Sequence, residues 1–177
     1  MRDAGFGVVG CHFAGFEARE LRIAGFSLKE IVSAKDYRGN RYESYSLEEL
    51  RIAGYEPRDF ELAGCGPKDM KAAGFSAEDL MQAGYPPRDL RGAGFRAGEL
   101  LRFGCGLEDL KEAGYGAGEL RTAGFSAGDL KDVGYSAKEL KAAGFTSKEL
   151  SEAGIGLLKR LFRRRGAIKD LEQRIAL

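Results

Sequence analysis

Residues 125–134 read Phe-Ser-Ala-Gly-Asp-Leu-Lys-Asp-Val-Gly, and this ten-residue pattern recurs along most of the chain. A glycine falls at every tenth position from Gly54 to Gly154, and the same ten-residue spacing is present upstream at Gly5, Gly15 and Gly25. An aromatic residue usually follows the glycine, an acid stands four residues later, and a leucine or another large apolar residue comes next. Copies at a fixed spacing identify a tandem repeat array.

One unit of ten carries start and stop signals for a short helix. Ser136 is a good N-cap, and Glu139 three residues later completes a capping box. Pro57 and Pro87 fall at the first helical position, where proline is tolerated. The glycine suits the left-handed conformation that ends a helix. The pattern predicts one helix of six or seven residues per unit, with connections of two or three residues.

A single unit buries too little to be stable. One aromatic and one leucine contribute about 3–6 kcal/mol on burial, whereas ordering ten residues costs about 10–20 kcal/mol of backbone entropy. The units must therefore stack, and we expect an all-α solenoid, or superhelix, of short helices. In its apolar spine Phe125 would contact both Leu120 and Leu130.

A pentapeptide-type β-helix is the rival fold, because ten is twice five. Its narrow interior requires a small residue two positions before the leucine. Arg88, Glu108 and Lys138 stand there, which favours the helical interpretation.

The units resemble tandem decapeptide repeats of the form Ala-Gly-Phe-Ser-x-x-Glu-Leu-Lys-x, which occur in protist and algal repeat proteins. The resemblance covers residues 45–155 well and residues 1–34 in part. It implies a repeat scaffold and brings no catalytic residues with it.

Departures from the pattern divide the chain into four segments. Residues 1–34 are degenerate repeats, 35–44 an irregular insertion rich in tyrosine and arginine, and 45–155 the regular array. Residues 156–177 form a basic amphipathic segment that we expect to be a C-terminal helical cap.

The insertion supplies the first candidate site, for contact with a partner protein. Tyrosine and arginine are enriched in binding hot spots. The candidates are Tyr37, Arg38, Arg41, Tyr42 and Tyr45. The alternative is a plain loop that absorbs a one-residue slip in the phase of the repeat.

The C-terminal segment supplies the second candidate, a basic contact. Residues 155–177 carry seven bases and two acids, a charge of +5, so the other 154 residues carry −4 of the net +1. The clustered bases are Lys159, Arg160, Arg163, Arg164 and Arg165. Apart from capping the array, such a helix could bind an anionic membrane surface, nucleic-acid phosphate or an acidic protein.

The chain begins in mid-repeat, without a helix cap, and an open solenoid end exposes apolar surface. Either the chain is part of a longer protein or another surface covers this end. Head-to-tail stacking of copies would cover it and could build a filament.

Catalytic and cofactor chemistry finds little support in the residues. His12 is the only histidine, and Cys11 beside it is not a metal-ligand spacing. Cys65 and Cys105 occupy the aromatic position, which predicts reduced thiols in the core. The recurring acids are explained by N-capping. We therefore predict a protein that is not an enzyme and has no catalytic residues, no metal site and no cofactor.

Composition agrees with a binding protein. The chain has 177 residues, of which 44% are hydrophobic, with 28 Lys and Arg against 27 Asp and Glu. No run approaches the ~20 apolar residues of a membrane span. The second helical residue and the two residues after the leucine vary, so they are candidates for contact with a partner. A net-acidic array argues against a nucleic-acid reader.

We expect an intracellular scaffold, cytoplasmic or organellar, that binds other proteins or itself as a structural or assembly subunit. The alternative is a peripheral membrane protein anchored by its basic C-terminal helix.

Overall fold

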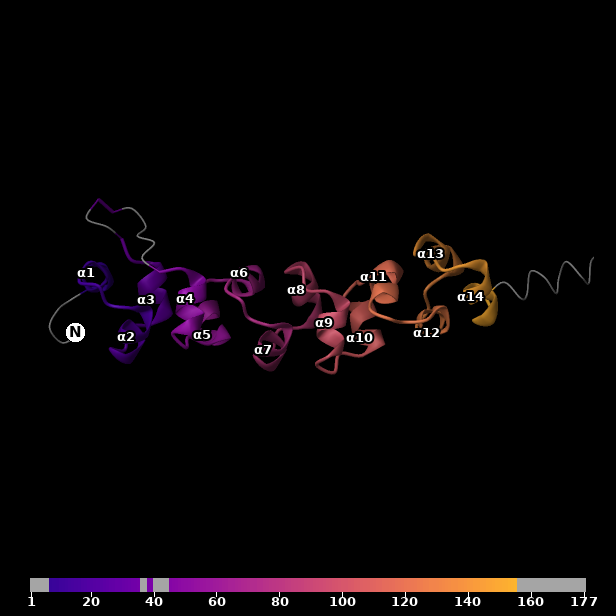
Figure 1. The fold of residues 1–177 in the computed structure, drawn as a ribbon, viewed down its shortest axis with the longest axis horizontal. Helices are drawn as coiled ribbons and strands as arrows, with labels where there is room; N and C mark the ends of the chain where they lie inside the picture. Colours follow the sequence, from indigo (N-terminus) through magenta and orange to yellow (C-terminus); the bar gives the residue numbers. More distant parts are fainter. Residues whose placement is uncertain (1–6, 36–37, 40–44, 156–177) are drawn as a thin grey trace, which may run out of the picture. The chain divides into compact units, whose positions relative to one another are not determined.

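The computed structural model describes residues 7–35, 38–39 and 45–155 (Figure 1). Two compact units divide the chain, Met1–Phe95 and Arg96–Leu177. Helices in the described part of the first unit are α1 Val8–Phe13, α2 Ala18–Ile23, α3 Leu28–Val32, α4 Leu47–Ile52, α5 Pro57–Leu62, α6 Pro67–Ala72, α7 Ala77–Gln82 and α8 Pro87–Gly92. Those of the second are α9 Ala97–Leu101, α10 Leu107–Glu112, α11 Ala117–Thr122, α12 Ala127–Asp132, α13 Ala137–Ala142 and α14 Ser147–Glu152.

Most helices begin where the sequence predicts, because the acid at the third helical position accepts a hydrogen bond from the N-cap N–H. Twelve of the described helices make this bond, with N···O distances of 2.6–2.9 Å. Ser and Thr N-caps also accept from the N–H of that acid, as Ser126 does from Asp129 at 3.2 Å. The N-cap of α8 is Pro86, which has no N–H to donate. The helix starts therefore rest on local hydrogen bonds.

Glycine ends the helices in a left-handed conformation. In twelve of the fourteen described helices the residue after the C-cap is a glycine with φ between 68° and 104°. In α11, for example, the Gly124 N–H donates to the Arg121 carbonyl, and the Phe125 N–H donates to that of Leu120. This pair of bonds is a Schellman motif, which turns the chain sharply enough for the next helix to start two residues later.

The helices stack on the second helix along the chain. In the first unit α2 packs on α4, α4 on α6, and α6 on α8; in the second α9 packs on α11, α11 on α13, and α12 on α14. Figure 1 shows α6 and α8 on one side of the chain path and α7 on the other. The structural period is therefore twenty residues, or two sequence repeats. This arrangement is an all-α solenoid of short helices, as predicted.

The leucine position forms the core of both units as far as α13, and Leu150 of α14 is half-buried. Leu50, Phe60, Leu90 and Leu120 are among the side chains there with no exposed surface. The aromatic position is buried at Tyr115 and half-buried at others, such as Phe125. These two rows make the apolar spine that the sequence pattern predicts.

One aromatic contact reaches further along the chain than the sequence pattern suggests. The rings of Phe60 and Phe75 meet edge to face with centroids 5.0 Å apart. Fifteen residues separate them, whereas the sequence pattern suggests contacts between residues five apart. Stacking of alternate helices brings the aromatic over an earlier helix, which periodicity alone does not specify.

The stack continues across the insertion. Helix α2 packs on α4 and α3 packs on α5, as alternate helices do elsewhere. The Tyr55 hydroxyl donates to the Phe26 carbonyl 29 residues earlier, whereas Tyr135 donates to Tyr115 20 residues earlier. The difference, 29 − 20, is nine residues. The insertion therefore adds nine residues to the chain without changing the packing of its neighbours. The predicted C-terminal cap, residues 156–177, lies outside the described residues.

Candidate functional site

The recurring acids look like a row of catalytic carboxylates, but the structure uses them as caps. The hydroxyl and the N–H of Ser126 hold the pKa of Asp129 below its ordinary value. The same two groups of Ser136 lower the pKa of Glu139. These acids are ionised and engaged at helix starts, where they also complement the helix dipole.

The thiols and the histidine lie apart from any cluster of ligands. Cys11 and Cys105 are buried and Cys65 is half-buried, and none of the three forms a disulfide bond within the described residues. Burial raises the pKa of the Cys105 thiol, which disfavours the reactive thiolate. In the part of the chain that the structure describes, no three His, Cys, Asp or Glu side chains are grouped so that they could hold a metal ion.

A basic residue at the fifth helical position reaches the C-terminus of the second helix along the chain. Its side chain donates to a carbonyl at or just after the C-cap of that helix, and we call this contact the cation clasp. The donor–acceptor pairs are Arg51–Ala73 (2.6 Å), Lys71–Gly94 (2.5 Å), Lys111–Val133, Arg121–Ala143 (3.1 Å) and Lys131–Ala153 (2.9 Å).

The same cation also lies over the aromatic ring that follows the glycine. Lys71 lies 4.5 Å from the ring centroid of Phe95, and the pairs Lys111–Tyr135, Arg121–Phe145 and Arg22–Tyr55 have separations of 5.5, 4.9 and 5.9 Å. A helix C-terminus carries partial negative charge and unsatisfied carbonyls, and an aromatic face attracts cations. The clasp therefore joins alternate helices by electrostatic contacts on top of the apolar spine.

The cation clasp gives one predicted surface position a structural role. Both residues after the leucine are predicted to be variable surface positions for a partner, and in five helices the first of them is a clasp donor. A signal in the sequence could have revealed it. From α2 to α10 the residue after the leucine alternates between a base and a non-basic residue, as in Arg51, Glu61, Lys71 and Met81. That alternation has the twenty-residue period of the stack.

The second residue after the leucine faces solvent in many helices, and in four helices of the first unit it is a large apolar residue. Phe13, Ile23, Ile52 and Leu62 are the sixth residues of α1, α2, α4 and α5, with 76%, 77%, 68% and 66% of their surface exposed. We call these four residues the exposed apolar set. Because α2 packs on α4, Ile23 and Ile52 occupy equivalent places on stacked helices. Grouped exposed apolar side chains mark interaction surfaces.

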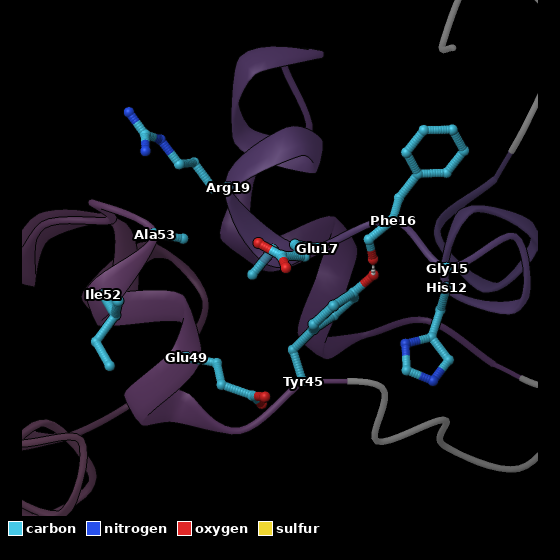
Figure 2. A pocket seen from close by; sticks show the side chains of 10 residues that line it. His12, Gly15, Phe16, Glu17, Arg19, Tyr45, Glu49, Ile52 and Ala53 are labelled. Atoms are coloured by element: carbon cyan, nitrogen blue, oxygen red, sulfur yellow. Dashed lines mark hydrogen bonds between the residues drawn. The ribbon is translucent and has the colours of Figure 1, made fainter.

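A cavity of about 530 Å³ is lined in part by Ile52 of this set (Figure 2). The start of α2 contributes Phe16, Glu17 and Arg19, and α4 with its lead-in residue contributes Tyr45, Glu49 and Ile52. His12 of α1 closes one side, with its ring edge to face with Tyr45 at 5.1 Å between centroids. The Tyr45 hydroxyl donates to the Phe16 carbonyl, which fixes the ring in the wall.

The cavity is lined by both acidic and apolar residues. In Figure 2 the carboxylates of Glu17 and Glu49 lie toward the Tyr45 ring. The N–H and hydroxyl of Ser46 hold the pKa of Glu49 below its ordinary value, and the charge of His12 makes a smaller contribution in the same direction. Glu49 is therefore ionised at neutral pH. Such a site favours a ligand that combines a cation with apolar surface.

The structure places two of the five residues predicted in and beside the insertion. Tyr45 is half-buried in the cavity wall, and Arg38 is exposed in a turn. The other three, Tyr37, Arg41 and Tyr42, lie outside the described residues, as do the basic candidates Lys159, Arg160, Arg163, Arg164 and Arg165. Sequence reasoning found Tyr45 but missed Glu17, Glu49 and Ile52 as its neighbours. The stacking of α2 on α4 across the insertion brings these residues together.

Comparison with known proteins identifies the repeat. A family model described as Decapeptide repeat region matches residues 32–106 and 94–159, which together span most of the chain. Searches of curated proteins and of solved structures found no match. None of the helices in the described ranges is long and apolar enough to cross a bilayer.

Proposed function

We propose that this chain, which belongs to the decapeptide repeat family, is a non-enzymatic scaffold that binds other proteins as a structural or assembly subunit. The observation that carries the proposal is the exposed apolar set of the first unit. Phe13, Ile23, Ile52 and Leu62 are large apolar side chains that the fold does not need for its core.

The regularity of the array makes this exposure informative. At the same helical position the later helices carry polar residues such as Thr122, Asp132 and Glu152, so solvent there ordinarily meets a polar side chain. The apolar residues therefore reflect something other than folding. A partner surface that removes them from water would gain about 25 cal/mol for each Å² of apolar area buried.

The absence of enzymatic activity is part of the same proposal. It is supported by the engagement of the acids at helix starts and of the bases in cation clasps, which leaves the recurring charges with structural roles. The raised pKa of Cys105 supports it further, because a buried thiol is a poor nucleophile.

A capture experiment with matched surface variants tests the proposal. The full chain is tagged, mixed with native lysate that includes membranes, cross-linked and analysed by quantitative mass spectrometry. We expect a few stoichiometric protein partners, and we expect the Ile23→Ser/Ile52→Ser variant to lose at least one of them. The control is Thr122→Ser/Asp132→Asn, at the same helical position in the second unit.

Three results would contradict the proposal. If no protein is captured at a stoichiometric level by the intact chain, the scaffold role fails. Recovery of lipid vesicles alone, abolished by deletion of residues 156–177 with the helical content preserved, would favour the membrane alternative. Equal loss of partners from the first-unit variant and its control would leave the scaffold without its proposed surface.

A further inference from the structure

The cavity beside Tyr45 occupies a place in the array where a cation clasp is expected. Arg22 lies over Tyr55, 33 residues later, and Lys71 lies over Phe95, 24 residues later. The difference, 33 − 24, is the nine inserted residues. His12 and Tyr45 are also 33 residues apart, so His12 stands at the clasp position for Tyr45.

His12 makes a ring–ring contact at the position where longer bases place a cation. In the regular clasps the cation lies over the ring face, whereas the imidazole of His12 meets Tyr45 edge to face, with 89° between the planes. The side chain of histidine is also shorter than that of arginine or lysine. The cavity of about 530 Å³ remains beside the ring, within the ~300–1,000 Å³ typical of ligand sites.

The walls of the cavity match a basic side chain with apolar neighbours. The Tyr45 ring offers the aromatic surface that the clasps use for a cation, and Glu17 and Glu49 add two carboxylates against the single guanidinium of Arg19. Phe16 and Ile52 add apolar surface, with Ile52 largely exposed at the rim.

We propose that this cavity binds an arginine or lysine side chain from residues 156–177 of a second copy of the chain. The inference rests on the proposed scaffold function and names one partner for it. Residues 155–177 carry a charge of +5, against −4 for the other 154 residues. Their bases alternate with large apolar residues, Leu157, Leu158, Leu161 and Phe162. Charge and apolar content are therefore complementary to the cavity.

The same charges argue against a membrane as the occupant. An anionic lipid surface would approach the carboxylates of Glu17 and Glu49, and like charges repel. A basic peptide segment gains from these carboxylates, while its leucines can cover Ile52 and the rest of the exposed apolar set. The second copy thus uses, between molecules, the contact that the cation clasp makes within one.

Binding in trans is the direct test. A fluorescent peptide of residues 156–177 is titrated into the full chain at low salt, and fluorescence anisotropy reports the affinity. We expect saturable binding that weakens as salt is added. Glu17→Gln should weaken it by about two- to five-fold, the range for one partly screened charge pair. Its control is Glu56→Gln, at the same N-cap position of α5 outside the cavity.

A second variant fills the cavity from within. His12→Arg places a long base at the clasp position, where it can lie over Tyr45 as Arg22 lies over Tyr55. We expect it to abolish peptide binding while circular dichroism stays unchanged. Gln82→Arg adds the same charge on α7, away from the cavity, and should bind the peptide like the unmodified chain.

Sedimentation velocity of the full chain completes the test. We expect concentration-dependent self-association that is lost in His12→Arg and retained in Gln82→Arg. A strict monomer at all concentrations would overturn the inference, and so would equal peptide affinity for His12→Arg and the unmodified chain. Binding to vesicles without self-association would also overturn the inference. The scaffold function fails separately, if the full chain captures no protein partner from lysate.

Discussion

The two units have the same kind of core but differ at two positions on their helices. At the sixth helical position the first unit carries the exposed apolar set, whereas the second unit carries residues such as Thr122 and Asp132. At the fifth, bases alternate with other residues through the first unit, as in Arg51 and Glu61, but are consecutive from α10 to α13 in the second. The buried leucine position is the same in both.

This difference separates what the fold requires from what it leaves open. The leucine, the glycine and the capping acid recur in both units because each helix must be buried, ended and started. The fifth and sixth helical positions differ between the units because residues of either kind are compatible with the stacking of the helices. Under the proposed function, the surface for a partner therefore lies on the first unit.

The largest expected effect tests the shared core. Leu21→Ala in the first unit and Leu120→Ala in the second each remove a side chain with no exposed surface. Each should lower the free energy of unfolding by about 2–5 kcal/mol, through lost burial and a cavity. Urea denaturation followed by circular dichroism measures both.

Leu62→Ala is the matched control, because the same substitution is made where 66% of the side chain is exposed. Its cost should stay within about 0.5 kcal/mol. A loss below about 1 kcal/mol for Leu120→Ala would show that the core of the second unit is not the one described.

A smaller effect tests how the helices end. Gly124→Ala forces alanine into φ 104° in open space, so strain alone should cost about 1–2 kcal/mol. Gly54→Ala meets the same kind of strain, and its Cβ would also lie 2.9 Å from the Arg22 guanidinium. It should cost more than Gly124→Ala, because the cation must move as well.

The effect of alanine on stability should have the opposite sign at Gly118, which is exposed at the second position of α11 with no atom near the added Cβ. There alanine should stabilise by about 0.5–1 kcal/mol, since glycine is costly inside a helix. Thermal unfolding of the three variants ranks them. If Gly124→Ala were as stable as Gly118→Ala, the left-handed helix ends would be wrong.

The sequence predicts the helices and their ends because these depend on local chemistry. Ser126, Asp129 and Gly134 each act within a few residues, so a ten-residue pattern is enough to assign a helix start and end. The burial of Leu130 follows from the same pattern, because an isolated short helix is not stable and its apolar face must be covered.

The stacking order and the cavity could not be predicted in this way. Whether a helix packs on its neighbour or on the next helix but one depends on the angle at each turn, which the residue pattern does not state. The clasp between Lys131 and Ala153 spans 22 residues and depends on that angle. The cavity depends further on closure of the stack across the insertion, which brings Glu17 beside Tyr45.

The cation clasp predicts a still smaller effect on stability, which tests the difference between the two units in their basic residues. Lys131→Met keeps the apolar stem but removes the hydrogen bond to the Ala153 carbonyl. We expect a loss of about 0.3–1 kcal/mol that shrinks as salt is added, because the contact is between a cation and a helix C-terminus. Denaturation at low and high salt measures it.

Lys148→Met is the control for the clasp. The Lys148 side chain is 86% exposed and pairs only loosely with Glu152, at 3.9 Å. Such surface pairs contribute little, so the loss should be no more than about 0.5 kcal/mol. Equal effects for Lys131 and Lys148 would mean that the clasp adds nothing beyond an ordinary surface charge.

The smallest effect concerns pH and distinguishes the helix start beside the cavity from a regular one. Hydrogen bonds from the N-cap serine lower the pKa of both Glu49 and Asp129 in the folded chain. A carboxyl with a lowered folded pKa binds fewer protons in the folded state. Its stabilising contribution is therefore complete above the unfolded pKa, near 4, and is lost as pH falls through the folded value.

Glycine at the N-cap serine removes the hydroxyl donor and should raise the pKa of the acid toward its ordinary value. NMR titration of the side-chain carboxyls measures this for Ser46→Gly and Ser126→Gly. His12→Gln should raise the pKa of Glu49 a little further, because the charge of His12 also lowers it, and should leave that of Asp129 unchanged. If the pKa of Glu49 does not change in His12→Gln, the imidazole is too far from the carboxylate to influence the charge of the cavity. The binding of a basic side chain there would then depend on Glu17, Glu49 and the Tyr45 ring alone.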